Sequence, residues 1–230
     1  MKTIGLVGGM TPESTKAYYE LLIEGARQPG GDPLRNPEIL VFSLDLTELV
    51  QIQREGERSE VVEYLADRLE RLRLAGAEVG ALTANTPHTY LDEIRAKTSL
   101  PLVSIVTATR NAATERKLER SLLLGTRTTL EAEMYPQEFG DAGIRIVLPC
   151  DDDSTFLDYT IYNDLAVGHV KAEVRKRYHD ICAKHIESDG IDSVILGCTE
   201  LPLVISSDDL SIQVLDTTRT HVAAILAAAS

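Results

Sequence analysis

The chain has 230 residues, 43% of them hydrophobic and 26% charged, a balance typical of a globular protein that is long enough to bury a substantial core. Its formal net charge of −13 argues against nucleic acid or an anionic membrane surface as a partner, and no apolar run approaches the roughly 20 residues of a membrane span. Three scattered cysteines predict neither a disulfide framework nor a metal site, and together with an N-terminus unlike a signal peptide they favour the cytoplasm.

Short apolar runs rich in β-branched residues alternate with helical patterns along the chain. Unbroken runs of this kind are typical of parallel strands that are covered on both faces. The runs that predict strands are Thr3–Val7, Ile39–Leu44, Val79–Thr83, Leu102–Ile105, Ser121–Leu124, Ile144–Leu148, Ser193–Leu196 and Ile212–Leu215. The alternation predicts an α/β fold with doubly wound, mainly parallel sheets, in which ligands lie beyond the carboxyl ends of the strands.

Two helices are predicted by apolar residues at three-and-four spacing. Ser59–Gly76 carries such a stripe and ends at a glycine, a common helix stop. Its stripe consists of Val62, Leu65, Leu69 and Leu72. The second helix, Lys171–Ser188, carries Val174, Tyr178, Ile181, Cys182 and His185 on one stripe. The proline- and glycine-rich segment Pro29–Pro37 predicts a loop.

The segment Gly8–Thr15 follows the first predicted strand and opens a helix. Thr11 suits the N-cap and Pro12 the first helical position. Glycines allow close backbone approach and a helix N-terminus favours an anion, so one interpretation is a seat for a small carboxylate. The other interpretation is a tight structural turn. The glycine spacing does not match a dinucleotide fingerprint, and the segment lacks the lysine of a P-loop.

Two further segments place small polar residues after predicted strands. Asn85–His88 offers neutral hydrogen-bond donors, although turn chemistry and a helix cap would use the same residues, and a structural hydrogen bond is the commoner role of such a histidine. Gly125–Thr129 offers hydroxyls that either cap a helix or bind a carboxylate. Each segment is therefore open to a structural and a functional interpretation.

Cys198 stands at the end of a predicted strand, in the sequence Gly-Cys-Thr-Glu. Backbone N–H groups behind a thiol in this place can lower its pKa and make it reactive. A single cysteine is often only a small buried apolar residue. That description suits Cys182, on its helical stripe, and Cys150, which ends an apolar run. It suits Cys198 less well, because polar Thr199 and Glu200 follow at once.

The four segments VGGMTPEST, ANTPH, LLGTRTT and LGCTELP together resemble the signatures of the aspartate/glutamate racemase family, in order and spacing, over essentially the whole chain. The resemblance implies two similar α/β lobes with the active site in the cleft between them. Ala81–Thr86 and Ile195–Glu200 end two strands in a similar way, as two such lobes would require. We expect an N-terminal lobe over residues 1–104, completed by 213–230, and a C-terminal lobe over 105–212.

Members of this family racemise amino acids without pyridoxal phosphate, so the resemblance implies no cofactor and no metal. It also implies a homodimer and a small acidic amino acid or related carboxylate as substrate. In the family a cysteine from each lobe flanks the substrate α-carbon. One thiolate removes the α-proton and the other thiol protonates the opposite face, because one group cannot easily serve both faces. The resemblance assigns the second cysteine to Cys198 and gives it the L-enantiomer.

This sequence departs from the family at the first cysteine, which normally precedes the Asn-Thr pair directly. That position is Ala84, and Thr83 is the nearby side chain that could pass a proton. A strand would point Thr83 away from the side that residue 84 faces. A hydroxyl is also a much poorer acid and base than a thiol. We therefore expect Cys198 and, as an atypical partner, Thr83 to be the catalytic residues.

Three functions are compatible with these residues. The first is an amino-acid racemase of aspartate/glutamate type, the second a one-cysteine decarboxylase or isomerase of a small diacid, and the third an inactive relative that binds a small acid. The residues that we expect to bind substrate are Met10, Gln53, Asn85, Thr86, Thr126, Thr128 and Thr199. The partner of a distal carboxylate stays open among Arg54, Arg127 and Arg219, each of which is more often a solvated surface arginine.

Overall fold

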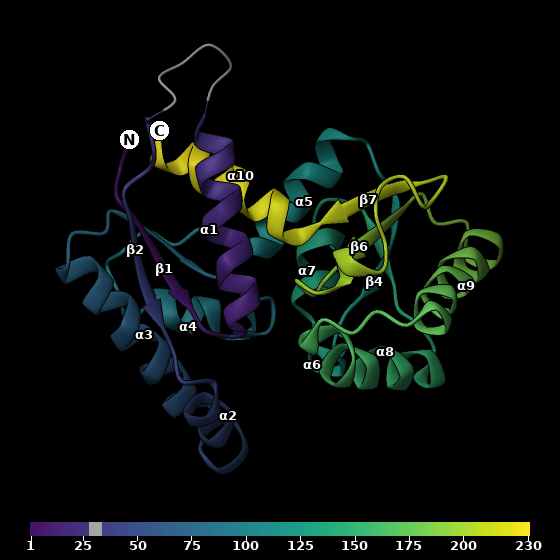
Figure 1. Cartoon of the computed structure of the whole chain (residues 1–230), viewed down its shortest axis with the longest axis horizontal. Helices are drawn as coiled ribbons and strands as arrows, with labels where there is room; N and C mark the ends of the chain where they lie inside the picture. Colours follow the sequence, from purple (N-terminus) through teal and green to yellow (C-terminus); the bar gives the residue numbers. More distant parts are fainter. Residues whose placement is uncertain (28–33) are drawn as a thin grey trace. The chain divides into compact units, whose positions relative to one another are not determined.

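The computed structural model describes residues 1–27 and 34–230, which divide into two compact units (Figure 1). The first unit is Met1–Ile105 with His221–Ser230, and the second is Val106–Thr220. The return to the first unit was expected too early, at residue 213. The strand Gln213–Asp216 pairs with the sheet of the second unit, and the chain rejoins the first unit at His221, within the last helix. The start of the predicted loop Pro29–Pro37 lies outside the described residues.

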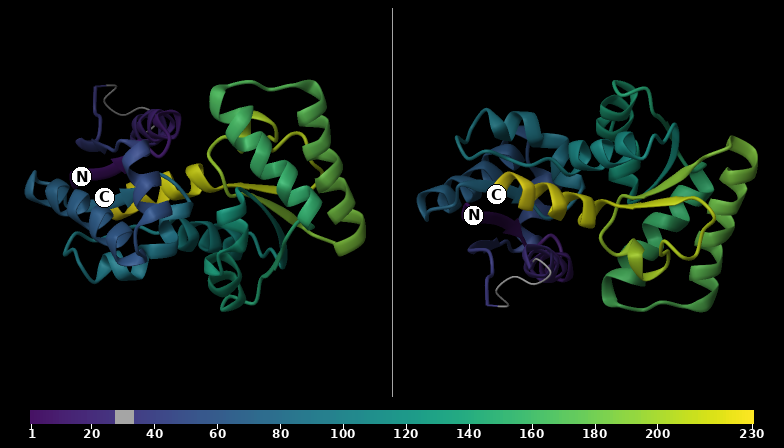
Figure 2. Two further views of the ribbon diagram at one scale, coloured as in Figure 1. Left: turned by 90° about the horizontal axis from the view of Figure 1, so that it is seen from below. Right: turned by 90° about the horizontal axis from the view of Figure 1, so that it is seen from above.

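The first unit contains a parallel three-stranded sheet in the order β2-β1-β3, as predicted for an α/β fold. Its strands are β1 (Ile4–Gly8), β2 (Ile39–Ser43) and β3 (Val79–Leu82). Its helical segments are α1 (Pro12–Ala26), α2 (Leu46–Glu55), α3 (Arg58–Leu74), η1 (Thr86–Tyr90), α4 (Leu91–Arg95) and most of α10 (Thr217–Ala229). Both termini lie in this unit (Figure 2), where the Lys2 N–H donates to the Ala229 carbonyl.

Helices cover both faces of this sheet, because successive β1 side chains point to opposite sides. Ile4 and Leu6 pack with residues of α1 and α10, whereas Val7 packs with residues of α2, α3 and α4. The predicted stripe of α3 is buried throughout. Thr11 caps α1 by accepting the Ser14 N–H, and Pro12 opens the helix. The sequence patterns therefore formed the layers that they predicted.

The second unit contains a parallel four-stranded sheet in the order β5-β4-β6-β7. Its strands are β4 (Arg120–Leu124), β5 (Arg145–Val147), β6 (Ser193–Leu196) and β7 (Gln213–Asp216). Its helical segments are α5 (Ile105–Glu115), α6 (Arg127–Glu131), α7 (Met134–Gly140), α8 (Asp151–Asn163), η2 (Leu165–Val167), α9 (Ala172–Asp189) and η3 (Leu201–Leu203). The five residues of the predicted α9 stripe are all buried.

The predicted strand Leu102–Ile105 is wrong. Only a single bridge pairs Leu102 with Gly80, and α5 already begins at Ile105. The Ile105 N–H, which a continuing strand would offer to its neighbour, donates to His88 Nε2 instead. Within the described residues, no helix is long and apolar enough to cross a membrane.

Candidate functional site

Cys198 lies in the turn that follows β6. The Gly197 N–H extends the sheet by one hydrogen bond to the Leu124 carbonyl, and Cys198 is the next residue. The side chain of Cys198 is half-buried, whereas the strand before it is fully buried. The thiol therefore stands at the carboxyl end of a buried strand, where ligands of α/β sheets bind.

The Cys198 thiol is hydrogen-bonded to the Glu200 carboxylate. Its Sγ donates to Glu200 Oε2 over 2.9 Å, and the Thr199 hydroxyl donates to the same oxygen over 2.8 Å. Burial and the negative charge of Glu200 raise the pKa of Cys198 well above its ordinary value. Hydrogen bonds from the backbone N–H groups of Glu200 and Thr199 lower this pKa, as we expected. Burial and the carboxylate outweigh these donors, so the pKa is raised and the expectation of a lowered pKa is wrong.

This geometry gives Glu200 a chemical task. A thiol whose pKa is raised is mostly protonated at neutral pH, and it needs a base to become a nucleophile or a proton acceptor. The buried Glu200 carboxylate lies within hydrogen-bonding distance of that proton. A cysteine–carboxylate pair can thus shuttle one proton between sulfur and oxygen while keeping a single negative charge.

The hydroxyls of the segment after β4 are arranged differently from the prediction. Thr126 is buried, and its Oγ1 lies 3.2 Å from Thr129 Oγ1. Thr128 instead faces solvent. Residues two apart on the α6 turn point to different sides of the helix, so Thr129 occupies the inward place that was expected for Thr128.

Tyr162 lies on α8, and its pKa is raised. Burial and the charges of Asp158, Cys198 and Glu200 raise the pKa of Tyr162, while a hydrogen bond with Thr126 opposes this. The phenol therefore stays protonated. Tyr162 follows Asp158 by one turn of α8, and Asp158 Oδ1 accepts the Arg127 N–H over 2.8 Å. Helical spacing places these two residues on one face of α8.

In the first unit, the glycine-rich segment forms a tight turn. Gly9 has a φ of +84°, and a Cβ there would lie 2.5 Å from the Leu44 carbonyl oxygen. The Gly9 N–H donates to Thr15 Oγ1, so this donor is already used within the turn. Met10 is half-buried against the core residues around α3. These contacts favour the structural interpretation of the glycines.

The turn after β3 corresponds to the turn that carries Cys198. The Thr83 N–H donates to the Val7 carbonyl, as the Gly197 N–H does to Leu124. Thr83 therefore corresponds to Gly197, and half-buried Ala84 corresponds to Cys198. The Thr83 side chain is 0% exposed, and its Oγ1 has no hydrogen-bond partner among the described residues. An enclosed hydroxyl is poorly placed to exchange a proton with a substrate, which disfavours Thr83 as a catalytic group.

Two buried histidines lie beside this turn: His88 bonds to it directly, and the His221 ring packs against His88 with 5.6 Å between the ring centroids. His88 Nδ1 donates to the Ala84 carbonyl over 2.9 Å while Nε2 accepts the Ile105 N–H. His221 Nε2 donates to the Val103 carbonyl, and its Nδ1 accepts the Tyr18 hydroxyl. Burial lowers the pKa of His88 to about 4 and that of His221 to about 3. Both rings are therefore neutral at physiological pH, and His88 has the expected structural role.

The other predicted contacts are more exposed or already occupied. Asn85 is buried and Thr86 half-buried beside Ala84, whereas Gln53 and Arg54 are exposed on α2. Arg127 pairs with Glu131 and donates to Thr155. The side chain of Arg219 is 70% exposed and pairs with Asp216. None of these three arginines is thus a buried, unpaired cation.

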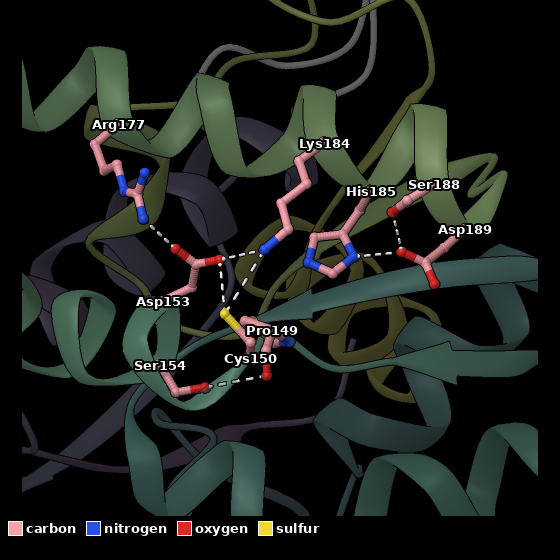
Figure 3. A network of polar contacts seen from close by, with 9 residues as sticks. All are labelled: Pro149, Cys150, Asp153, Ser154, Arg177, Lys184, His185, Ser188 and Asp189. Atoms are coloured by element: carbon pink, nitrogen blue, oxygen red, sulfur yellow. Dashed lines mark hydrogen bonds and ion pairs between the residues drawn. The ribbon is translucent and has the colours of Figure 1, made fainter.

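The remaining cysteines differ from one another. Cys182 is buried on α9 as expected, and burial raises its pKa to about 12. Cys150, expected to be buried, is exposed because it is the residue before α8, and its thiol donates to Asp153 Oδ2 over 3.1 Å. Figure 3 shows that carboxylate also held by Arg177 and Lys184. The described residues contain no group of His, Cys, Asp and Glu side chains suited to a metal ion.

Comparison with known proteins identifies the relatives of this chain. The protein-family model of Asp/Glu/hydantoin racemases matches residues 7–225. The broad specificity amino-acid racemase RacX of Bacillus subtilis (strain 168) is 23% identical over 217 residues, covering 93% of this chain and 92% of the relative.

Solved structures agree over the whole chain. An aspartate racemase homologue from Pyrococcus horikoshii OT3 is 35% identical with a TM-score of 0.89, covering 100% of this chain and 99% of that one. A provisionally assigned Asp/Glu racemase from Yersinia pestis is 34% identical with a TM-score of 0.92 and the same coverage. These similarities confirm the two-lobed α/β fold class.

Proposed function

Since the chain belongs to the Asp/Glu/hydantoin racemase family, we propose that it is an amino-acid racemase of aspartate/glutamate type in which Cys198 removes the α-proton. The observation that carries this proposal is the 2.9 Å hydrogen bond from the Cys198 thiol to Glu200 at the end of β6. A thiol that is already hydrogen-bonded to an acceptor can pass its proton to that acceptor and then act as a general base. The racemases among the relatives support the reaction type.

Cys198 and Glu200 together account for both proton transfers of the first half-reaction. The thiol proton moves from Sγ to a Glu200 oxygen, and the resulting thiolate takes the α-proton of the amino acid. The electron pair of the broken C–H bond passes into the substrate carboxylate as a planar enediolate-like carbanion. Return of a proton from Sγ restores the original enantiomer, and with solvent deuterium on sulfur it produces exchange without inversion.

Inversion needs a proton on the opposite face, and the chain lacks the matching thiol. The position equivalent to Cys198 is Ala84, whose methyl group carries no proton. Thr83 next to it has a buried hydroxyl, so it would deliver a proton slowly, and water is the alternative donor. We therefore expect exchange of the α-hydrogen to be faster than inversion.

The proposed substrate contacts are those predicted from the sequence, with a changed order of importance. Thr199 has the strongest support, because its hydroxyl and the Cys198 thiol donate to the same Glu200 oxygen, and Thr126 is buried directly before α6. Asn85, Thr86 and Met10 flank the turns after β3 and β1. Gln53 and Thr128 are exposed, so their contribution depends on a side chain that solvent also reaches.

We further propose that the reaction needs no cofactor and that the protein is a cytoplasmic homodimer. Proton transfer by sulfur and carboxylate requires neither a metal nor pyridoxal phosphate. Activity should survive exhaustive dialysis against a chelator, and light scattering after gel filtration should give twice the chain mass of 25.2 kDa. Activity that a metal restores after dialysis would contradict the first statement, and a monomeric mass the second.

A second candidate function is favoured by Ala84 alone. A decarboxylase or isomerase of a small diacid needs protonation on one face only, so it would not miss a second thiol. An inactive relative that binds a small acid would need neither group. Such proteins differ from a racemase in what they do to the α-hydrogen of an amino acid.

The deciding experiment incubates the protein in heavy water with L- and D-aspartate and L- and D-glutamate. Mass spectrometry follows deuterium at the α-carbon, and chiral chromatography follows the enantiomer ratio in the same samples. We expect deuterium uptake, with the L-enantiomers first and inversion lagging behind. Consumption of a diacid without α-exchange of amino acids would support the second candidate, and binding without any reaction would support the third.

A further inference from the structure

A network of polar side chains outside the Cys198 turn joins the start of α8 to α9 (Figure 3). Its centre is Asp153, which lies in the first turn of α8 and whose side chain is 2% exposed. The Asp153 carboxylate pairs with Arg177 through Oδ1 and with Lys184 through Oδ2, the latter over 3.1 Å. Arg177 and Lys184 are about two helical turns apart, so they lie on one face of α9. The network therefore fixes that face of α9 to the start of α8.

Cys150 brings a sulfur atom into this network. It is the residue directly before α8, and its Sγ donates to Asp153 Oδ2 over 3.1 Å. Lys184 Nζ lies 3.7 Å from the same sulfur. Because Asp153 Oδ2 bonds to both groups, the sulfur of one helix start and the nitrogen of another helix are held next to each other. A thiol and an amine do not react with each other until the sulfur is oxidised.

The Cys150 sulfur is also the most accessible of the three. Cys150 is exposed and the Lys184 side chain is 53% exposed, so a small oxidant can approach from solvent. Cys182 is buried, and Cys198 is half-buried with its thiol bonded to Glu200. Since oxidation of thiols follows their exposure, we expect Cys150 to react first.

We propose that Cys150 and Lys184 form an oxidative modification site, at which a hydroperoxide converts the contact between Sγ and Nζ into a covalent S–N bond. Hydroperoxides oxidise thiols to sulfenic acids, and sulfenic acids condense with nitrogen to sulfenamides. The cross-link joins the residue before α8 to α9, and a thiol reductant cleaves it. The site is separate from the residues proposed to act on the substrate.

The first step forms the sulfenic acid. The Cys150 thiol gives its proton to solvent, and the sulfur attacks one oxygen of hydrogen peroxide, so an S–O bond forms while the O–O bond breaks. The hydrogen bond and the charge of Asp153 raise the pKa of Lys184, so its nitrogen starts as an ammonium. The leaving hydroxide takes a proton from this ammonium and becomes water. A neutral amine then stands beside the oxidised sulfur.

The second step forms the cross-link. The Lys184 amine attacks the Cys150 sulfur, so an S–N bond forms while the S–O bond breaks. The hydroxyl group leaves as water with a proton from the nitrogen. The sulfur has then lost two electrons, and hydrogen peroxide has been reduced to two molecules of water.

The test treats the full chain with hydrogen peroxide and measures its intact mass and its tryptic peptides. We expect a loss of about 2 Da, from the two hydrogens that the S–N bond replaces, and a linked pair of peptides that carry Cys150 and Lys184. Dithiothreitol should restore the parent mass. Lys184→Arg keeps a cation beside Asp153 without an amine, so it should abolish the link and leave a sulfenic acid that dimedone traps. A parent in which Cys150 stays a thiol, or becomes a sulfinic acid without the link, would overturn the inference.

Three further variants separate this link from other products. Lys176→Arg is the matched control, because Lys176 lies on the same helix, is 74% exposed and pairs with Asp180, so the link should persist. Cys182→Ala and Cys198→Ala exclude a disulfide, which would cause the same loss of mass. A mass loss that survives in all three variants and is absent in Lys184→Arg supports the inference. A mass loss that survives in Lys184→Arg, or that either cysteine replacement abolishes, would overturn it and leave the proposed function untouched.

Discussion

The turns after β3 and after β6 occupy the same place in two sheets of related topology, yet their chemistry differs. The order β2-β1-β3 recurs as β5-β4-β6, with β7 added at one edge. The turn after β6 carries the Cys198 thiol, which is hydrogen-bonded to a carboxylate. In the turn after β3 the residue equivalent to Cys198 is Ala84. One repeat of the fold thus has an acid/base pair, whereas the other has a turn held by His88.

This difference shows that the fold and the chemistry of a repeat are separable. The β3 turn keeps its backbone hydrogen bond to the neighbouring strand, its buried Asn85 and its buried His88 without any group that can transfer a proton from residue 84. Stability therefore gives no reason to retain a thiol there. Substitutions in one of these turns should therefore have effects that equivalent substitutions in the other turn do not reproduce.

The largest effect is expected for Cys198→Ala. Removing the thiol should lower α-hydrogen exchange and turnover by at least about 10²–10⁴-fold, the usual contribution of one general base. Exchange measured by mass spectrometry in heavy water tests this. Cys150→Ala and Cys182→Ala are the controls, since neither cysteine lies in the β6 turn. Comparable exchange in the Cys198 variant would exclude this turn as the source of the base.

Glu200→Gln should reduce kcat/KM for exchange by roughly 10–100-fold, because the thiol proton loses its positioned acceptor. The same change removes the charge that, together with burial, raises the pKa of Cys198, so that pKa should fall. The pH dependence of thiol alkylation measures this shift. Thr199→Val keeps the carboxylate and should leave the titration nearly unchanged. A thiol pKa that stays the same or rises in the Gln variant would contradict the pairing.

The two buried histidines of the first unit, His88 and His221, predict that acid destabilises the protein. His88 and His221 are neutral when folded, with pKa values of about 4 and 3, whereas an unfolded histidine titrates near 6.5. Below that pH the unfolded chain binds more protons, so stability rises with pH across the window from 4 to 6.5. Between pH 7 and 5.5 the free energy of unfolding should fall by about 2 kcal/mol.

Urea unfolding followed by tyrosine fluorescence at several pH values measures this slope. His88→Gln removes one of the two buried rings and should reduce the pH dependence by about half. A flat stability profile in the parent would show that the two rings are not held neutral by burial.

The smallest effect is expected from restoring symmetry. Ala84→Cys places a thiol at the position equivalent to Cys198 and should raise the ratio of inversion to exchange by about tenfold, the low end for one acid/base group that is not optimally seated. Thr83→Cys is the matched control, because residue 83 corresponds to Gly197 and is enclosed. A gain at residue 83 and none at 84 would reverse the proposed equivalence and would return Thr83 to the catalytic role first predicted for it.

Local patterns in the sequence determined the layers of the fold and the main candidate residue. The N-cap Thr11, the stripes of α3 and α9, and most strand positions follow from periodicity and capping, which depend on neighbours within a few residues. The sequence alone also identified the motif around Cys198 and the alanine at residue 84, because the family signatures are short and contiguous. Local patterns failed at Leu102–Ile105. The predicted strand is absent there, because the Ile105 N–H donates to His88 Nε2 and not to a neighbouring strand.

Only the tertiary structure decided the chemistry around those residues. The sign of the pKa shift at Cys198 depends on where the Glu200 side chain points. Thr129 replaced Thr128 as the inward hydroxyl for the same reason. Electrostatic and hydrogen-bond energies fall steeply with distance, and the distances between residues far apart in the chain are set by packing and not by local propensity.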